Sequence, residues 1–231
     1  MGMTIAERIR QVRRSMAKAA ERAGRDPKSV TLVAVGKTQP TEAVARAVRA
    51  GITDLGENRV GEAAAKRPGV PPATWHLIGP LQRNKVKRAL EVFDIVETVD
   101  RPELVLRLAM QLENHWPGRR LPVLLEVNIG GEPQKAGVSP AEAARLARAV
   151  LEQPQLELRG LMTVPPFEPD PAAVRPFFRA LAALARELRQ ELGEPLEWLS
   201  MGMSHDFEVA IEEGATHVRV GTAIFGQRRT A

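Results

Sequence analysis

The chain has 231 residues, of which 44% are hydrophobic and 4% aromatic, so Val, Leu, Ile and Ala must build one large core. It contains no cysteine, which excludes disulfides, thiolate metal ligands and a thiol nucleophile. The formal net charge of +5 permits a nucleic-acid or membrane-surface role. However, the basic residues are mixed with Glu and lack interleaved aromatics, so we expect neither partner. No apolar stretch is typical of a signal peptide or a membrane span, and we expect a cytoplasmic location.

The predicted elements alternate between short apolar runs and amphipathic stretches. A capping box over residues 4–7 begins the first helix, and Gly24 ends it. Later helices begin near Pro102, Pro140 and Pro171. Apolar runs predict strands at 30–36, 52–56, 75–79, 94–99, 122–128, 158–164, 196–201 and 217–221.

This alternation of strands and helices predicts one α/β domain over residues 1–231, folded as a (β/α)8 TIM barrel. A doubly wound open sheet is the alternative. That fold usually carries a G-x-G-x-x-G sequence after its first strand, whereas this chain has Gly36-Lys37-Thr38 there. In a TIM barrel the carboxyl ends of all strands face one mouth, so we sought the functional residues there.

Lys37 comes at the end of the first apolar run, immediately before Thr38-Gln39-Pro40. Partial burial at this strand end would lower the pKa of its ammonium and favour a nucleophilic amine. The alternative is a lysine whose side chain extends to solvent.

The last two strand ends predict a phosphate site. Gly202 and Gly221 would let backbone N–H groups approach an anion, and Thr222 adds a hydroxyl. Ser204 is placed to cap the helix that runs to Glu213. The alternative is that the serine only caps and the glycines only turn the chain. A lysine amine together with a phosphate site suggests pyridoxal 5′-phosphate (PLP) held as a Schiff base on Lys37.

Arg219 lies on the last predicted strand, two residues before Gly221, where its side chain can point into the barrel mouth. A guanidinium stays charged. Placed at the pyridine nitrogen of PLP, it would keep that nitrogen unprotonated and weaken the ring as an electron sink. The alternative is an ion pair with an interior acid such as Glu57 or Glu126.

Other polar residues are weaker candidates. Asn58 could bind the cofactor or only cap backbone, and His76 is expected to be a satisfied core histidine. Glu126 and Asn128 could face the interior as a polar pair that needs partners. Lys135, in a long loop, could gate the site, contact an anion or lie on the surface. The four histidines lack the spacing of a helical metal site, so we predict no metal.

Several of these segments carry a family resemblance, namely 32–38, 56–58, 75–82, 160–162, 199–204 and 218–226. They resemble the pyridoxal phosphate homeostasis protein family, which is similar to the N-terminal barrel of alanine racemase. The resemblance implies a fold-type III barrel with PLP on Lys37 and Arg219 at the pyridine nitrogen. It also implies phosphate contacts from Ser204, Gly221 and Thr222, with Ser200 as a further candidate.

Two positions depart from the pattern of the family that the chain resembles. Relatives often have Ser where this chain has Gly36, and many have an aromatic or aliphatic residue where it has Arg59. The first departure removes at most one hydroxyl contact. The second has no explanation in the sequence.

The resemblance implies a protein that carries or buffers PLP in vitamin B6 homeostasis, with little or no catalytic turnover. Its implied partners are PLP and apo PLP-dependent enzymes, and its implied state is a monomer, with a dimer as the alternative. The alternative function is a weak PLP-dependent amino-acid racemase. Alanine racemase takes its second base, a tyrosine, from a separate C-terminal domain of the partner subunit. This chain contains no tyrosine, which favours the carrier.

Overall fold

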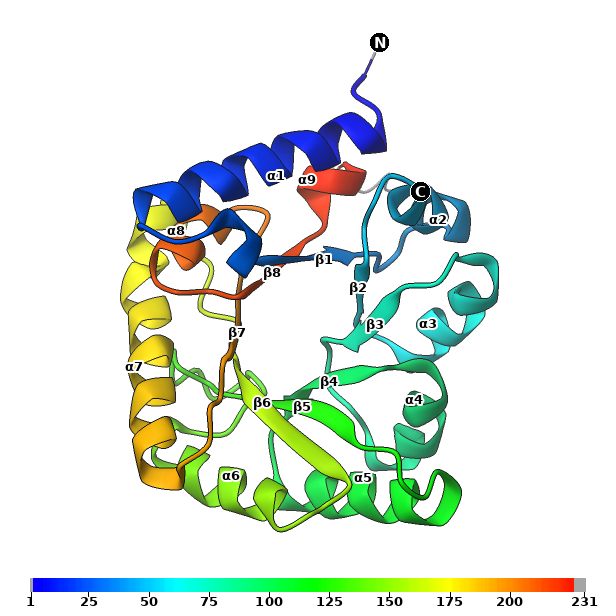
Figure 1. Cartoon of the computed structure of the whole chain (residues 1–231), viewed down its shortest axis with the longest axis vertical. Coiled ribbons are helices and arrows are strands. Elements are labelled where there is room, and N and C mark those ends of the chain that lie inside the picture. The colour runs from blue at the N-terminus through cyan, green and yellow to red at the C-terminus, as the bar shows by residue number, and fades with distance from the viewer. Residues whose placement is uncertain (1, 227–231) are drawn as a thin grey trace.

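The computed structural model describes residues 2–226; Met1 and residues 227–231, which the predicted domain includes, lie outside the described residues. The strands form a closed parallel barrel in the order β1 to β8 (Figure 1). The predicted (β/α)8 barrel is therefore confirmed. The strands are β1 (Thr31–Val35), β2 (Asp54–Glu57), β3 (Thr74–Leu77), β4 (Ile95–Val99), β5 (Leu121–Glu126), β6 (Leu156–Met162), β7 (Trp198–Met203) and β8 (His217–Val220).

Helices surround the barrel as an outer layer (Figure 1). The predicted starts at Pro140 and Pro171 prove to be short 3₁₀ turns that precede α6 and α7, whereas α5 begins at Pro102 itself. None of the described helices is long and apolar enough to cross a membrane. The helices are α1 (Ile5–Arg22), α2 (Thr41–Arg49), α3 (Val60–Lys66), α4 (Val86–Val92), α5 (Pro102–His115), α6 (Ala143–Leu151), α7 (Arg175–Leu192), α8 (Phe207–Glu212) and α9 (Thr222–Phe225).

The barrel wall separates two packed regions, because successive side chains of a strand point to opposite faces. Outward-facing residues, such as Trp75 and Leu77 of β3, belong to the large core that the helices cover. Inside the barrel, Ile95, Leu124 and Met162 form a small apolar cluster against Trp198. Other inward positions carry the polar side chains described below.

The first and last strands are neighbours. β1 pairs in parallel with β8, with Leu32 opposite Val218 and Ala34 opposite Val220. Helix α1 packs against α8 and α9 outside this seam (Figure 1). Barrel closure therefore brings the turn after β1 and the turn after β8 to the same mouth, although almost the whole chain separates them.

Gly61 is an exposed glycine within the first turn of α3. A Cβ at this position would have nothing within 4 Å. Because glycine loses more backbone entropy than alanine, Gly61→Ala is expected to raise the free energy of unfolding by about 0.5 kcal/mol, measured by urea denaturation. Gly160→Ala is the matched contrast, since its Cβ would overlap the carbonyl oxygen of Trp198. Equal effects of the two changes would contradict this account.

Candidate functional site

Lys37 lies in the turn between β1 and α2, separated from the end of the strand by Gly36. Its side chain is half-buried. Its charge interacts with the carboxylate of Glu57, which is buried at the end of β2. The lysine therefore lies at the barrel mouth in a partly desolvated setting, as the apolar run before it predicts.

A second lysine, Lys66 of α3, is buried beside this turn. Its Nζ donates hydrogen bonds to the Gly36 carbonyl at 2.7 Å, to Glu57 Oε1 at 2.7 Å and to Glu62 Oε1 at 2.6 Å. Burial raises the pKa of Glu57 to about 7, against the opposing effect of the Lys66 hydrogen bond. Lys66 is not among the predicted site residues, although the i, i+4 spacing of Glu62 and Lys66 is a visible signal for an ion pair on one helix face.

The cluster explains why glycine, and not a larger residue, occupies position 36. A Cβ at position 36 would lie 2.9 Å from Glu57 Oε1 and 3.0 Å from a Val44 methyl group. Both contacts are tighter than ordinary packing allows. A serine could enter here only if the buried carboxylate or the valine moved.

The predicted phosphate residues meet at the start of α9. Ser204 Oγ accepts hydrogen bonds from the backbone N–H groups of Gly221 at 3.1 Å and Ala223 at 3.3 Å. Thr222, between them, is exposed. Because both N–H groups donate to the serine oxygen, the donors left for an anion are the hydroxyl protons of Ser204 and of the exposed Thr222.

The predicted capping role of Ser204 is wrong. Helix α8 begins at Phe207 after Asp206, and the carboxylate of Asp206 accepts the N–H of Met203 at 2.6 Å. Gly202 also has a structural role instead of an anion contact. It has φ +89°, and a Cβ there would lie 2.5 Å from the Cβ of Ala210. For Gly202, the alternative of a glycine that only turns the chain is therefore favoured.

Arg219 begins a chain of buried hydrogen bonds across the barrel interior. Its Nη1 donates to Ser200 Oγ at 2.7 Å, and its Nη2 donates to the Thr163 carbonyl at 2.7 Å. Ser200 in turn donates to Glu97 Oε2 at 2.6 Å. The direct partners of Arg219 are thus a hydroxyl and a carbonyl instead of the carboxylates of Glu57 or Glu126. Ser200 supports Arg219 in this arrangement, and its phosphate contact stays a prediction.

The same chain continues to the other end of the barrel through His76. Its Nδ1 lies 2.7 Å from Glu97 Oε1, and its Nε2 lies 3.1 Å from Asp54 Oδ1. Both partners are carboxylates, which only accept, so both ring nitrogens must carry protons. The prediction that His76 is a satisfied core histidine is confirmed. Glu97 was missed, although a single carboxylate inside the apolar run 95–99 could have signalled a buried partner.

The electrostatics favour a charged His76–Glu97 pair. Burial disfavours the imidazolium, but the hydrogen bonds with Asp54 and Glu97 outweigh it and raise the pKa of His76 to about 9. Burial likewise opposes ionisation of Glu97, but the hydrogen bond and charge of His76 lower the pKa of Glu97 to about 2. For His217, whose ring lies 6.2 Å from that of His76, burial lowers the pKa to about 4. One histidine of the pair is therefore charged and the other neutral at neutral pH.

The raised pKa of His76 predicts a pH-dependent stability. Its folded value of about 9 lies above the ordinary value of 6.5, so its stabilisation is complete below pH 6.5 and is lost as the pH rises through 9. The free energy of unfolding is expected to fall by at most about 3 kcal/mol across this window. His217, with a pKa of about 4, titrates below this window, whereas Glu57 and Glu126, with pKa values of about 7, titrate at its lower end. The effect of His76 is therefore read from the fall in stability at pH values above theirs.

Urea denaturation at a series of pH values measures this effect. The control is His76→Gln, whose stability should not show the same fall. Identical pH profiles for the two proteins would contradict the assignment.

Three buried side-chain oxygens at the strand ends have no hydrogen-bond partner among the described residues, namely Glu57 Oε2, Asn58 Oδ1 and Glu126 Oε2. Burial raises the pKa of Glu126 to about 7, and the charge of Asp100 adds to this effect. Unpaired buried acceptors are costly. Such atoms at a barrel mouth are suited to the donors of a bound molecule, and they fit the predicted role of Asn58 as a cofactor contact.

Three further residues lie in local structure around the mouth. The Asn128 amide donates to the Glu132 carbonyl at 2.8 Å, so the partner that the sequence predicts for it lies in its own loop. Lys135 forms an ion pair with Glu132 and donates to the Pro165 carbonyl at 3.0 Å, which ties two loops together. Arg59 is exposed just before α3 and interacts with the charge of Glu62.

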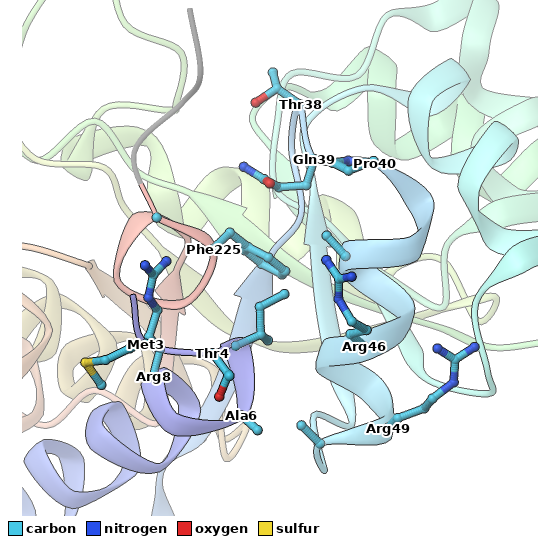
Figure 2. A pocket seen from close by; sticks show the side chains of 14 residues that line it. Met3, Thr4, Ala6, Arg8, Thr38, Gln39, Pro40, Arg46, Arg49 and Phe225 are labelled. Atoms are coloured by element: carbon cyan, nitrogen blue, oxygen red, sulfur yellow. The ribbon is translucent and has the colours of Figure 1, made fainter. Parts of the chain in front are cut away.

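A groove of about 1080 Å³ lies outside the barrel, between α1, α2 and α9. Figure 2 shows Arg8 and Arg46 on opposite sides of it, with Phe225 between them. Gln39 adjoins it from the turn that follows Lys37. The predicted site residues do not line this groove, although Thr38 and Gln39, which follow Lys37, do.

Comparisons with known proteins agree with the fold. The family model described as "Alanine racemase, N-terminal domain" matches residues 8–229. The chain is 46% identical to the pyridoxal phosphate homeostasis protein of Pseudomonas aeruginosa, over 97% of this chain and 96% of that protein. It is 42% identical to the protein of the same name from Aquifex aeolicus, over 98% of this chain and 100% of that protein.

The solved structures include PipY of Synechococcus elongatus with PLP bound. It matches with a TM-score of 0.84 at 37% identity and covers 96% of this chain and 100% of that chain. The same protein solved without PLP gives a TM-score of 0.85 at 38% identity. The fold described here therefore resembles both forms almost equally.

Proposed function

Because the chain belongs to the pyridoxal phosphate homeostasis protein family, we propose that it binds PLP at the barrel mouth as a Schiff base on Lys37. The observation that carries this proposal is the juxtaposition of an amine and an anion site. Lys37 follows β1, the hydroxyls of Ser204 and Thr222 follow β7 and β8, and β1 pairs directly with β8. PipY, whose whole chain matches 96% of this one, has been solved with PLP bound.

The residues present fit this cofactor. Lys37 supplies the amine, and the hydroxyls of Ser204 and Thr222 suit the phosphate. Asn58 Oδ1 is a buried acceptor without a hydrogen-bond partner among the described residues. Arg219 is held in place by Ser200 and the Thr163 carbonyl. The aldehyde of PLP would condense with the lysine amine, with loss of water.

We propose that the protein is a carrier or buffer of PLP with little or no turnover, which passes the cofactor to apo PLP-dependent enzymes. The relatives are named homeostasis proteins. A buried arginine that stays charged weakens the ring as an electron sink. The absence of tyrosine from the chain removes the phenol that alanine racemase uses as its second base. These observations favour the carrier over the weak racemase.

The test is the near-ultraviolet and visible absorption spectrum of the protein mixed with PLP, before and after borohydride, followed by peptide mass mapping. We expect an imine band that borohydride removes and a reduced adduct on Lys37. No band after addition of PLP would overturn the proposal. Rapid racemisation of an amino acid by the loaded protein would favour the alternative function.

A further inference from the structure

We propose that Lys66 is the positioning residue that keeps the Lys37 amine reactive, by fixing the turn that carries it and by neutralising the two carboxylates beside it. This inference rests on the proposed function, in which Lys37 is the carrier residue. It concerns three residues outside the predicted site, namely Lys66, Glu57 and Glu62.

The first observation is that all three N–H groups of the Lys66 ammonium have hydrogen-bond acceptors. Three hydrogen-bond donors are available on an ammonium, and the three acceptors are the Gly36 carbonyl, Glu57 Oε1 and Glu62 Oε1. The Lys66 side chain is only 7% exposed. A lysine this buried is rare unless it is paired, and here it joins the ends of β1 and β2 to helix α3.

The second observation is that this cluster holds the Lys37 turn on both sides. Lys66 binds the carbonyl of Gly36, immediately before Lys37. The Oε1 atom of Glu62 accepts the N–H of Thr38, immediately after it. Thr38 has φ +64°, which is unfavourable for a β-branched residue. A strained turn persists only where its surroundings hold it, and the cluster supplies those contacts.

The third observation is the local balance of charge. The charged groups beside the Lys37 turn include Glu57 at the end of β2, Glu62 and Lys66 on α3, and Arg59, whose charge interacts with Glu62. Above the Glu57 pKa of about 7, the charges of these two carboxylates and two cations sum to zero. Without Lys66 the sum is one negative charge. This charge would stabilise the ammonium form of Lys37 and reduce the fraction of the neutral, nucleophilic amine. The ammonium of Lys66 thus opposes the carboxylates that would otherwise deactivate its neighbour.

The experiment follows the reactivity of Lys37 in the cofactor-free protein. Acetic anhydride is applied in competition with a free amine over a range of pH, and the acetylated Lys37 peptide is quantified by mass spectrometry. In Lys66→Met, which removes the charge at similar length, the pH of half-maximal reactivity is expected to rise by about one unit. Lys87→Met on the exposed face of α4 is the matched control and should leave this midpoint unchanged.

Two more variants separate charge from structure. Glu62→Gln removes a carboxylate and should lower the midpoint, and Lys66→Met combined with Glu57→Gln should return it toward the wild-type value. These variants decide the question if Lys66→Met alone does not fold, since that change leaves Glu57 buried without its cation. An unchanged midpoint in Glu62→Gln, and in Lys66→Met where that variant folds, would overturn the inference.

The readout does not depend on PLP, so the two proposals can fail separately. If PLP loads on Lys37 but the midpoints do not move, only the role of Lys66 is wrong. If the midpoints move as expected but no adduct forms on Lys37, only the proposed function is wrong.

Discussion

Replacing Lys37 with alanine is expected to abolish the borohydride-reducible adduct while the barrel keeps its fold. The side chain is half-buried in a turn outside β1, so its loss removes no core packing. The amine is the group that bonds to the aldehyde, and alanine cannot replace it. Absorption spectra, mass mapping and circular dichroism of the variant mixed with PLP measure both parts of the prediction.

Lys135→Ala is the control for this change, because Lys135 is the other lysine that the sequence places near the mouth. It pairs with Glu132 and bonds to the Pro165 carbonyl. We expect this variant to keep the full adduct on Lys37. An adduct that survives Lys37→Ala would place the cofactor on a different lysine and would contradict the site.

Replacing Glu97 with alanine is expected to lower the free energy of unfolding by about 3–5 kcal/mol, the usual cost of breaking one side of a buried ion pair. Glu97 is almost completely buried, and its two oxygens bond to His76 and Ser200. Its loss leaves a buried imidazolium with Asp54 as the remaining partner. It also removes the acceptor of the Ser200 proton, and with it the support of Arg219.

Urea denaturation of Glu97→Ala, His76→Gln and the double variant measures this coupling as a thermodynamic cycle. We expect the double variant to be less destabilised than the sum of the two single changes, because the second change removes the charge that the first leaves unpaired. Simple additivity of the two changes would show that the pair contributes no coupling.

The strands of the barrel could be predicted because each is a short apolar run, and burial on both faces of a parallel sheet produces that pattern. The boundaries were less accurate where a polar residue begins a strand. The second strand was predicted at 52–56, yet β2 begins at Asp54, whose carboxylate binds His76 inside the barrel. The pattern of hydrophobicity carries no information about such a partner.

The candidate site was predicted where a residue follows a strand, as Lys37 and Gly221 do. It was missed where the role depends on a partner distant in the sequence. Glu97 and Ser200 are 103 positions apart, and Lys66 and Gly36 are 30 apart. Ser204 was assigned to the helix that follows it because capping is a local rule, but its partners are Gly221 and Ala223, which follow the neighbouring strand β8.

The seam between β1 and β8 has a consequence for the lifetime of the protein. A molecule bonded to Lys37 on one side of the seam and to Ser204 and Gly221 on the other would hold the two strands together. The amides of β1 and β8 that bond across this seam exchange with solvent only when the two strands separate. A ligand that binds only the closed form lowers the population of the open one. Binding of PLP is therefore expected to slow the hydrogen exchange of these amides and to protect the chain from proteolysis. Such a carrier would be degraded faster after it releases PLP, so its abundance would follow the supply of PLP.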